Sequence, residues 1–361
     1  MRVSTILRPL WAVAIFSLGL VAAAPRGKPH SALSKRTTAY FCDSDATATL
    51  TYSFNEMIQM LNVAISRTNS LQAFLADPPN HITGQGNLLQ STLYTFESIF
   101  GRLEYGAGND QNDEAIQRVE RVLNLAQTMK TGIQTINSNP HLEIYCSDLW
   151  LISEDPEGDI SLINPYLYWD NRETRSGPLA IDFEAAAGVC RDDESTHYAW
   201  VNPYLSSINT ASGQTSVMTL CQDDLARWAS RYQNGKTMMS FADQLFEHGQ
   251  IALNEFQGQT LTTALMHELT HAPAIVGADY LLDQPCELNG QTTSAYGWDC
   301  ITQLAKTPST ALKNADSFSF YITAMFLSKD DWSTGVSIPI PADVGPPDEN
   351  GLASMMSQLE I

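Results

Sequence analysis

The chain has 361 residues, 43% of them hydrophobic, and a formal net charge of −20 at pH 7. This length and apolar content allow a sizeable buried core and favour two lobes. Such a negative surface repels nucleic acid and anionic lipid, so neither nucleic acid nor a membrane is expected as a partner of the mature protein.

The first 24 residues have the layout of a secretory signal peptide. Arg2 and Arg8 are followed by an apolar run over 10–21 and then by three alanines at 22–24. This order of basic start, apolar middle and small-residue end is typical of a cleaved leader. The run is short for a membrane span, which needs roughly 20 residues. We therefore expect residues 1–24 to be removed and the protein to be secreted, with a membrane anchor as the alternative.

A second processing signal follows. Lys35-Arg36 is a dibasic pair in a stretch that contains Pro and Gly, so we expect residues 25–36 to be a short pro-segment and Thr37 to begin the mature chain. An ordinary charged pair in a loop is the alternative. Without residues 1–36, the chain keeps 14 basic and 40 acidic residues and is even more acidic.

Six cysteines follow the predicted pro-segment. An even number in a secreted chain predicts three disulfides, although the sequence does not choose among the possible pairings. No pair has the close spacing that is typical of cysteine-ligated zinc. The cysteines are Cys42, Cys146, Cys190, Cys221, Cys286 and Cys300.

The early part of the mature chain has helical periodicity. Apolar side chains recur at three- and four-residue spacing in 54–65 and in 116–129, which predicts two amphipathic helices. Asn112-Asp113-Glu114 suits the start of the second helix. Residues 150–215 are rich in Asp, Gly, Pro and aromatic residues, which favours short strands and loops, and residues 216–221 predict a strand.

A further helix is predicted over Leu261–Ala272. Thr260 or Thr262 could cap its start. Pro273 is expected to end it, because a proline disfavours helical backbone in the residue before it. Another helix is expected to begin near Asn314-Ala315-Asp316.

The helix predicted over Leu261–Ala272 contains the candidate metal-binding and catalytic residues, in the sequence His267-Glu268-Leu269-Thr270-His271. The four-residue spacing of His267 and His271 puts both imidazoles on one face, so both can bind one ion. Zn²⁺ accepts neutral imidazole and keeps a water molecule when three protein ligands hold it. Glu268 can take the proton of that water as it attacks a peptide carbonyl. The pattern predicts a zinc site with Glu268 as general base; two solvated histidines are the alternative.

This stretch resembles the deuterolysin-like aspzincins, secreted fungal zinc endopeptidases that include the peptidyl-Lys metalloendopeptidases. The resemblance runs from 267–271 through Ser294-Ala295-Tyr296-Gly297 to Asn314-Ala315-Asp316-Ser317-Phe318, and covers roughly 216–328. It implies a zincin fold in which His267 and His271 bind zinc and Glu268 is the general base. It also implies that Tyr296 stabilises the oxyanion.

The chain departs from the family at the third zinc ligand. The family's signature after the helix is Gly-Thr-x-Asp-x-x-Tyr-Gly, and alignment on Tyr296-Gly297 puts Thr293 where the ligand Asp stands. We expect Asp279 to replace it, because it is the first carboxylate after His271. The segment between Asp279 and Tyr296 would then be an insertion, tied by Cys286 and Cys300. Asp299 and Asp283 are rivals, and a site without a third ligand is a further alternative.

These observations predict an α+β protein in which a helical N-terminal region, 37–185, precedes a mainly helical zincin-like catalytic domain, 186–335, and a Pro-rich polar tail, 336–361. The expected function is a secreted zinc metalloendopeptidase that acts on protein or peptide substrates. The alternative is a catalytically inactive secreted protein that keeps the zincin fold and binds zinc or a host partner. Peptide-bond preference and oligomeric state do not follow from the sequence.

Overall fold

The computed structural model describes residues 39–77, 86–105, 112–152, 167–170, 177–180, 190, 199–202, 216–288 and 290–341. All of them belong to a compact unit that spans Arg36–Ile361. The predicted signal peptide, the pro-segment, the boundary between 185 and 186 and the tail beyond 341 lie outside the described residues.

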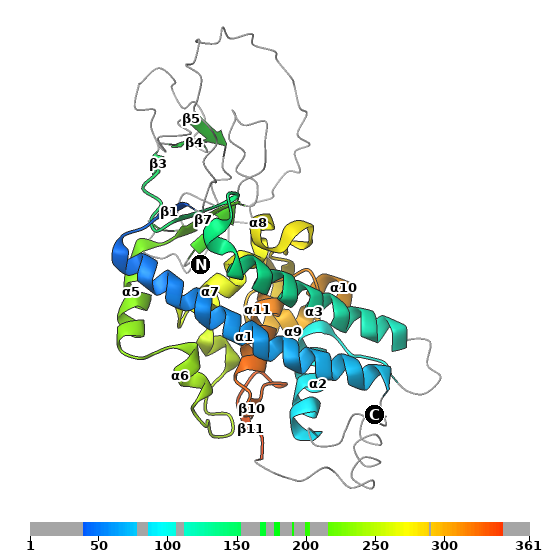
Figure 1. The fold of residues 1–361 in the computed structure, drawn as a ribbon. Coiled ribbons are helices and arrows are strands. Elements are labelled where there is room, and N and C mark those ends of the chain that lie inside the picture. Colours follow the sequence, from blue (N-terminus) through cyan, green and yellow to red (C-terminus); the bar gives the residue numbers. More distant parts are fainter. Residues whose placement is uncertain are drawn as a thin grey trace, which may run out of the picture. The chain divides into compact units, whose positions relative to one another are not determined.

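Three long helices open the described chain: α1 (Ser44–Ala76), α2 (Gly86–Phe100) and α3 (Asn112–Gln134). Asp43 caps α1, since its side chain accepts a hydrogen bond from the Ala46 N–H at 2.7 Å. α1 and α3 pack side by side (Figure 1). Both helices predicted in this region are confirmed, and α3 begins at the predicted Asn112.

A four-stranded sheet lies at one end of α1 and α3 (Figure 1). Its order is β1-β2-β7-β6, with β1 and β2 parallel, β2 and β7 parallel, and β7 and β6 antiparallel. The predicted strand over 216–221 is present as β7. The strands are β1 (Ala39–Phe41), β2 (Leu142–Tyr145), β6 (Ala199–Asn202) and β7 (Ser216–Leu220).

The rest of the described chain is a series of shorter elements. A separate sheet joins β3 (Leu151–Ile152), β4 (Leu167–Asp170) and β5 (Gly177–Ala180). The later elements are α5 (Gln222–Gln233), α6 (Met238–Ala242), α7 (Leu261–Glu268), α8 (Pro273–Val276), β8 (Pro285–Leu288), β9 (Gln291–Ser294), α9 (Gly297–Leu304), α10 (Pro308–Ala311), α11 (Ala315–Phe326), β10 (Asp330–Asp331) and β11 (Ile338–Pro339).

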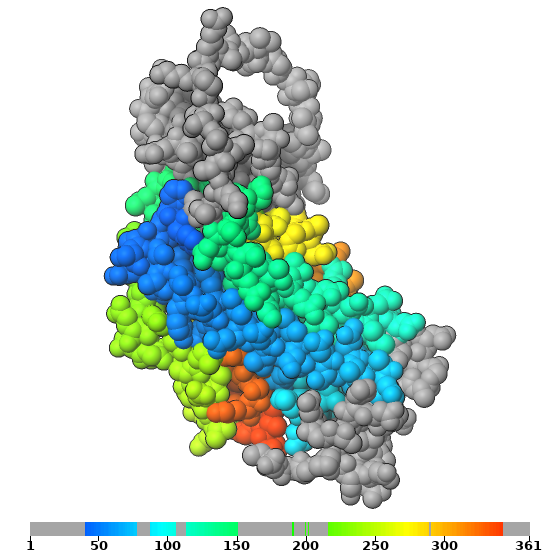
Figure 2. Space-filling model, in the orientation of Figure 1, coloured from blue at the N-terminus to red at the C-terminus, as the bar shows by residue number. Residues whose placement is uncertain are grey.

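The central helix of the core is α11, all of whose residues are buried. α1 packs against α11 and against α7, and α1 and α3 form a continuous outer surface on the side shown in Figure 2. Tyr321 of α11 shares a hydrogen bond of 2.9 Å with Thr68 of α1. The predicted regions 37–185 and 186–335 therefore contribute to one hydrophobic core. The fold is mixed helix and sheet, as the predicted α+β class requires.

Three disulfides join the six cysteines: Cys42–Cys146, Cys190–Cys221 and Cys286–Cys300. The prediction of three disulfides is confirmed, and the expected link between Cys286 and Cys300 ties β8 to α9. None of the helices in the described part of the chain has the length and apolar character that crossing a bilayer requires.

Candidate metal centre

The two histidines are presented by a buried helix that tightens at its end. Thr260 caps α7 by accepting a hydrogen bond from the Thr263 N–H at 3.3 Å, so the first of the two predicted caps is the one used. α7 continues as a 3-10 turn over Leu269–His271. The helix stops there because Pro273 begins α8, as expected, and Ala272 is extended. His267 and His271 still face the same side, and their Nε2 atoms are 3.2 Å apart.

The chain then turns and runs back beneath this helix end. Gly277 adopts a φ of 71°, which only glycine adopts without strain. Further along, the Leu281 N–H donates to the Thr270 carbonyl at 2.8 Å. The Leu282 N–H donates to the Lys313 carbonyl just before α11, and the Leu282 carbonyl accepts from the N–H of Ala315, the first residue of α11. The next residue, Asp283, is thereby held against the histidines.

Asp283 completes a group of three side chains that could hold a metal ion. Its Oδ1 lies 3.4 Å from Nε2 of His267 and 3.5 Å from Nε2 of His271. This Oδ1 is buried and has no hydrogen-bond partner within the described residues. A buried carboxylate oxygen without a partner is costly, which points to a ligand that the three atoms share.

The other ring nitrogen of each histidine, Nδ1, is hydrogen-bonded. Nδ1 of His267 is 2.9 Å from Oδ1 of Asp316, and Nδ1 of His271 is 2.8 Å from the Leu281 carbonyl. Both acceptors require the proton on Nδ1, so the lone pair of each neutral imidazole is on Nε2 and faces Asp283. This arrangement is the usual one for histidines that bind a metal.

The electrostatics of the group favour a positive charge between the three side chains. Burial by itself would lower the pKa of His267, but Asp283 and Asp316 outweigh it and raise this pKa well above its usual value. Burial would likewise raise the pKa of Asp283, but the two histidines hold it far below its usual value. A cation among these groups is therefore strongly stabilised, whether it is a proton or a metal ion.

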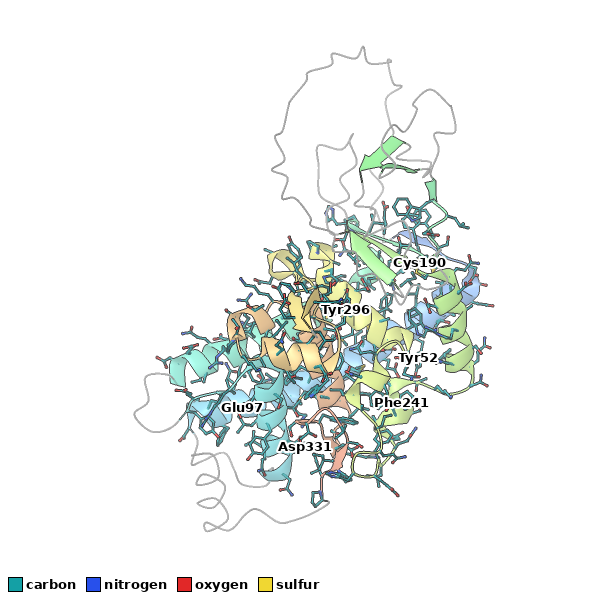
Figure 3. All side chains as sticks on the ribbon, turned by 180° about the vertical axis from the view of Figure 1, so that it is seen from behind. Tyr52, Glu97, Cys190, Phe241, Tyr296 and Asp331 are labelled. Atoms are coloured by element: carbon teal, nitrogen blue, oxygen red, sulfur yellow. A yellow bond between two sulfur atoms is a disulfide. The ribbon has the colours of Figure 1, made fainter. Side chains whose placement is uncertain are left out.

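The predicted catalytic residues lie beside this group. Tyr296 donates its hydroxyl hydrogen to Oδ2 of Asp283 at 2.8 Å, and its ring centroid is 5.7 Å from that of His267. Burial, together with the charge of Asp283, raises the pKa of Tyr296 far above its usual value. Figure 3 shows Tyr296 where the yellow and orange segments of the chain meet. His267, Glu268 and Tyr296 line a cavity of about 340 Å³, hereafter the site cavity.

The structure does not bring Asp279, the expected third ligand, to the histidines. Asp279 ends the exposed turn Gly277–Asp279, where the chain is still reversing its direction. Its rival Asp299 is exposed in the first turn of α9. Asp283, the other rival, is the carboxylate that joins His267 and His271.

The segment between Asp283 and Tyr296 is a hairpin that brings its two ends together. β8 and β9 form an antiparallel hairpin over 285–294, and the Ala295 N–H donates to the Gln284 carbonyl at 2.7 Å, so the hairpin closes on itself. With the hairpin left out, Asp283-Gln284 would run directly into Ala295-Tyr296-Gly297. That order has the spacing Asp-x-x-Tyr-Gly.

Asp316 is a site residue that the sequence reasoning did not identify. Besides its contact with His267, its Oδ2 accepts a hydrogen bond from the Gly297 N–H at 2.7 Å. It thus orients one histidine and fixes the backbone next to Tyr296. The sequence placed Asp316 at the start of a helix, as α11 confirms, but offered no link to His267, which is 49 positions away.

No protein-family model, no curated protein and no solved structure matches this chain. The functional assignment of these residues therefore depends on their own geometry and chemistry.

Proposed function

We propose that this protein is a secreted zinc metalloendopeptidase that holds Zn²⁺ through His267, His271 and Asp283. The observation that carries the proposal is the triangle of Nε2, Nε2 and Oδ1, with sides of 3.2, 3.4 and 3.5 Å. Two ligands of a tetrahedral zinc ion with bonds of about 2.0–2.1 Å lie about 3.3 Å apart. The three atoms are therefore spaced as zinc ligands.

The donor set favours zinc over other common ions. Two imidazole nitrogens and one carboxylate oxygen suit zinc, whereas calcium and magnesium prefer sites built of oxygen alone. Three protein ligands also match the pattern of catalytic zinc sites, since structural ones are closed by four. When bound, zinc supplies Lewis-acid catalysis, because it lowers the pKa of water and polarises a carbonyl.

The neighbouring residues support hydrolysis of a peptide bond. Glu268 lines the site cavity beside His267 and is half-buried, which suits a general base that takes a proton from water and passes it to the leaving amine. Tyr296 presents a hydroxyl at the same cavity and could stabilise the charge that develops on the carbonyl oxygen. It also orients Asp283 through its hydrogen bond.

An extended peptide is the substrate shape that the surroundings favour. β6 ends the four-stranded sheet and pairs, within the described residues, with β7 alone. Its first residue, Ala199, lines the site cavity. A sheet edge offers backbone groups to an extended chain, so a peptide added there would run past Glu268 and Tyr296.

Two further features agree with the proposal. The order Asp283-Gln284, Ala295-Tyr296-Gly297 around the hairpin has the spacing of the aspzincin signature, which makes Asp283 the counterpart of the family's third ligand. The three disulfides suit an oxidising compartment and support secretion, together with the predicted signal peptide.

Substitution of the proposed base tests this function. Glu268→Gln keeps the shape of the side chain and removes the base, so we expect peptide hydrolysis to fall by about 10²–10⁴-fold while zinc stays bound. The measurements are turnover of a denatured protein substrate and metal content. Glu247→Gln, at an exposed position that does not line the site cavity, is the matched control. If the wild-type protein binds zinc but cleaves no substrate, it is a zinc-binding protein without hydrolytic activity.

A further inference from the structure

Apolar groups line the site cavity together with the proposed catalytic ones. Ala264, one turn before Glu268 on α7, and Phe320 of α11 line it, and both are almost completely buried. Gln257, in the segment before α7, lines it as well. We use the term recess for the part of the cavity lined by these three residues.

The polar groups around the recess are already engaged with one another. Nε2 of Gln257 donates to Oγ of Ser319 at 3.1 Å. Both oxygens of Asp316 are used, one by His267 and one by the Gly297 N–H. Among the described residues, the remaining carboxylate that lines the cavity is Glu268, the proposed base. This part of the chain therefore offers a lysine or arginine side chain in the cavity no carboxylate that is not already engaged or needed for catalysis.

We infer that the recess receives one of the two side chains that flank the cleaved bond, and that it selects an uncharged, apolar side chain. This inference rests on the proposed function. An ammonium or guanidinium group placed against Ala264 and Phe320 would lose its hydration without gaining a partner, which is far more costly than burying an aliphatic side chain. A basic side chain that paired with Glu268 instead would neutralise the base.

Gln257 is the residue that sets this preference. It has the shape of glutamate without the charge, and it lines the recess at its boundary with α11, where Ser319 holds it. A carboxylate at this position would give a basic side chain the partner that it lacks. The charge state of residue 257 thus determines which side chains the recess accepts.

Cleavage of matched peptides tests the inference. In the first series, two peptides differ only in the residue before the cleaved bond, which is Leu or Lys. In the second series, the same pair of residues is compared at the position after the cleaved bond. For the position that enters the recess, we expect the wild-type enzyme to have a kcat/KM at least about tenfold higher with Leu than with Lys. Gln257→Glu should shift this ratio toward Lys by about tenfold or more.

Gln259→Glu is the matched control, since it makes the same charge change two positions away and does not line the cavity. It should leave the ratio unchanged. Metal content and thermal unfolding of each variant show whether it is folded, and the wild-type ratio is informative even if Gln257→Glu is unstable.

The outcomes separate the two proposals. Equal or faster cleavage of Lys peptides by the wild-type enzyme, at both flanking positions, would overturn the selectivity and leave the proposed peptidase intact. If folded Gln257→Glu has the same ratio of kcat/KM for Leu and Lys peptides as the wild type, Gln257 does not set the preference of the recess. If the zinc-loaded protein cleaves no peptide of either series, the proposed function fails and the inference falls with it.

Discussion

The two carboxylate oxygens of Asp283 have different surroundings. Oδ2 accepts a hydrogen bond from the hydroxyl of Tyr296, whereas Oδ1 is buried near two histidine nitrogens and has no hydrogen-bond partner among the described residues. A carboxylate is stable in such a position when a cation lies between it and the imidazoles. Hydrogen bonds of Leu281 and Leu282 fix the backbone that precedes Asp283 and so hold its side chain in place without an ion.

A pair of alanine substitutions therefore distinguishes the two candidate ligands. We expect Asp283→Ala to lower zinc affinity by at least about tenfold, as loss of a metal contact does, and to abolish proteolysis. Asp279→Ala is the matched control and should change neither property, because its side chain is exposed on the turn. Zinc affinity is measured by competition with a chelator. Loss of zinc from the Asp279 variant alone would reinstate Asp279 as the ligand.

The residues of the site differ in how far the sequence could predict them. His267, Glu268 and His271 lie within one helical stretch, so their relative positions follow from local backbone geometry. Asp283 comes from a loop whose path depends on hydrogen bonds to α7 and to α11, which no local pattern contains. Asp316 is further along the chain still, and its role depends on the packing of two helices.

At the scale of elements, the β8–β9 hairpin is anchored to α9. The disulfide Cys286–Cys300 joins β8 to α9. Gln303 of α9 also accepts a hydrogen bond from the Glu287 N–H at 3.0 Å and donates to the Glu287 carbonyl at 2.8 Å. The backbone before Asp283 has its own anchors, so the hairpin and Asp283 are held by separate contacts.

This arrangement predicts separate effects on stability and on metal binding. We expect Cys286→Ser combined with Cys300→Ser to lower the free energy of unfolding by about 3 kcal/mol, the value for a closed loop of this size. Zinc affinity should change much less than in Asp283→Ala. Urea unfolding and chelator competition measure the two properties. A loss of zinc as large as that in Asp283→Ala would show that the disulfide positions the ligand.

Helix prediction from periodicity was accurate where the apolar stripes were long. α1, α3, α7 and α11 were all expected, although α7 ends in a 3-10 turn before Ala272. No helix was predicted at α2, yet Leu89, Leu93, Phe96 and Phe100 are buried at helical spacing there, so it could have been found. The pairing of β1 with β2 could not have been predicted, because strands of three and four residues so far apart leave no local signal.

At the scale of the whole molecule, helices from the N-terminal and C-terminal parts of the chain pack against one another. Glu56 of α1 is buried and accepts hydrogen bonds from Oγ1 of Thr262 in α7 at 2.5 Å and from the Met239 N–H at 2.8 Å. The N-terminal helix thus reaches the helix that carries the histidines. Chain length favours two lobes only on average, and here one core serves both regions.

A buried acid in this core predicts how stability depends on pH. Asp330 is 1% exposed, its Oδ1 has no hydrogen-bond partner within the described residues, and burial raises its pKa to about 6. The folded state therefore binds this proton more tightly than the unfolded state, whose pKa is about 3.9. Below about pH 3.9, Asp330 is protonated in both states and does not lower the free energy of unfolding. As the pH rises from there to about 6, the free energy of unfolding falls.

Asp330→Asn should remove this loss, so that the variant gains stability relative to the wild type between pH 4 and 6 and keeps the gain above pH 6. Thermal unfolding across this pH range, as a difference between the two proteins, cancels the contribution of the metal site. Asp331→Asn is the matched control, because its carboxylate accepts a hydrogen bond from the Ser333 N–H at 2.8 Å. A variant that is less stable than the wild type at pH 7 would contradict the prediction.

The way in which the β8–β9 hairpin closes on itself has a consequence for protein engineering. Its two ends are joined by the hydrogen bond between Gln284 and Ala295, so the segment between them starts and ends at the same place on the protein surface. Foreign sequence spliced in near the exposed Gly290 would extend outward without separating Asp283 from Tyr296. This position is therefore suited to carrying an epitope tag or a fluorescent label close to Asp283 and Tyr296 without disturbing the fold around them.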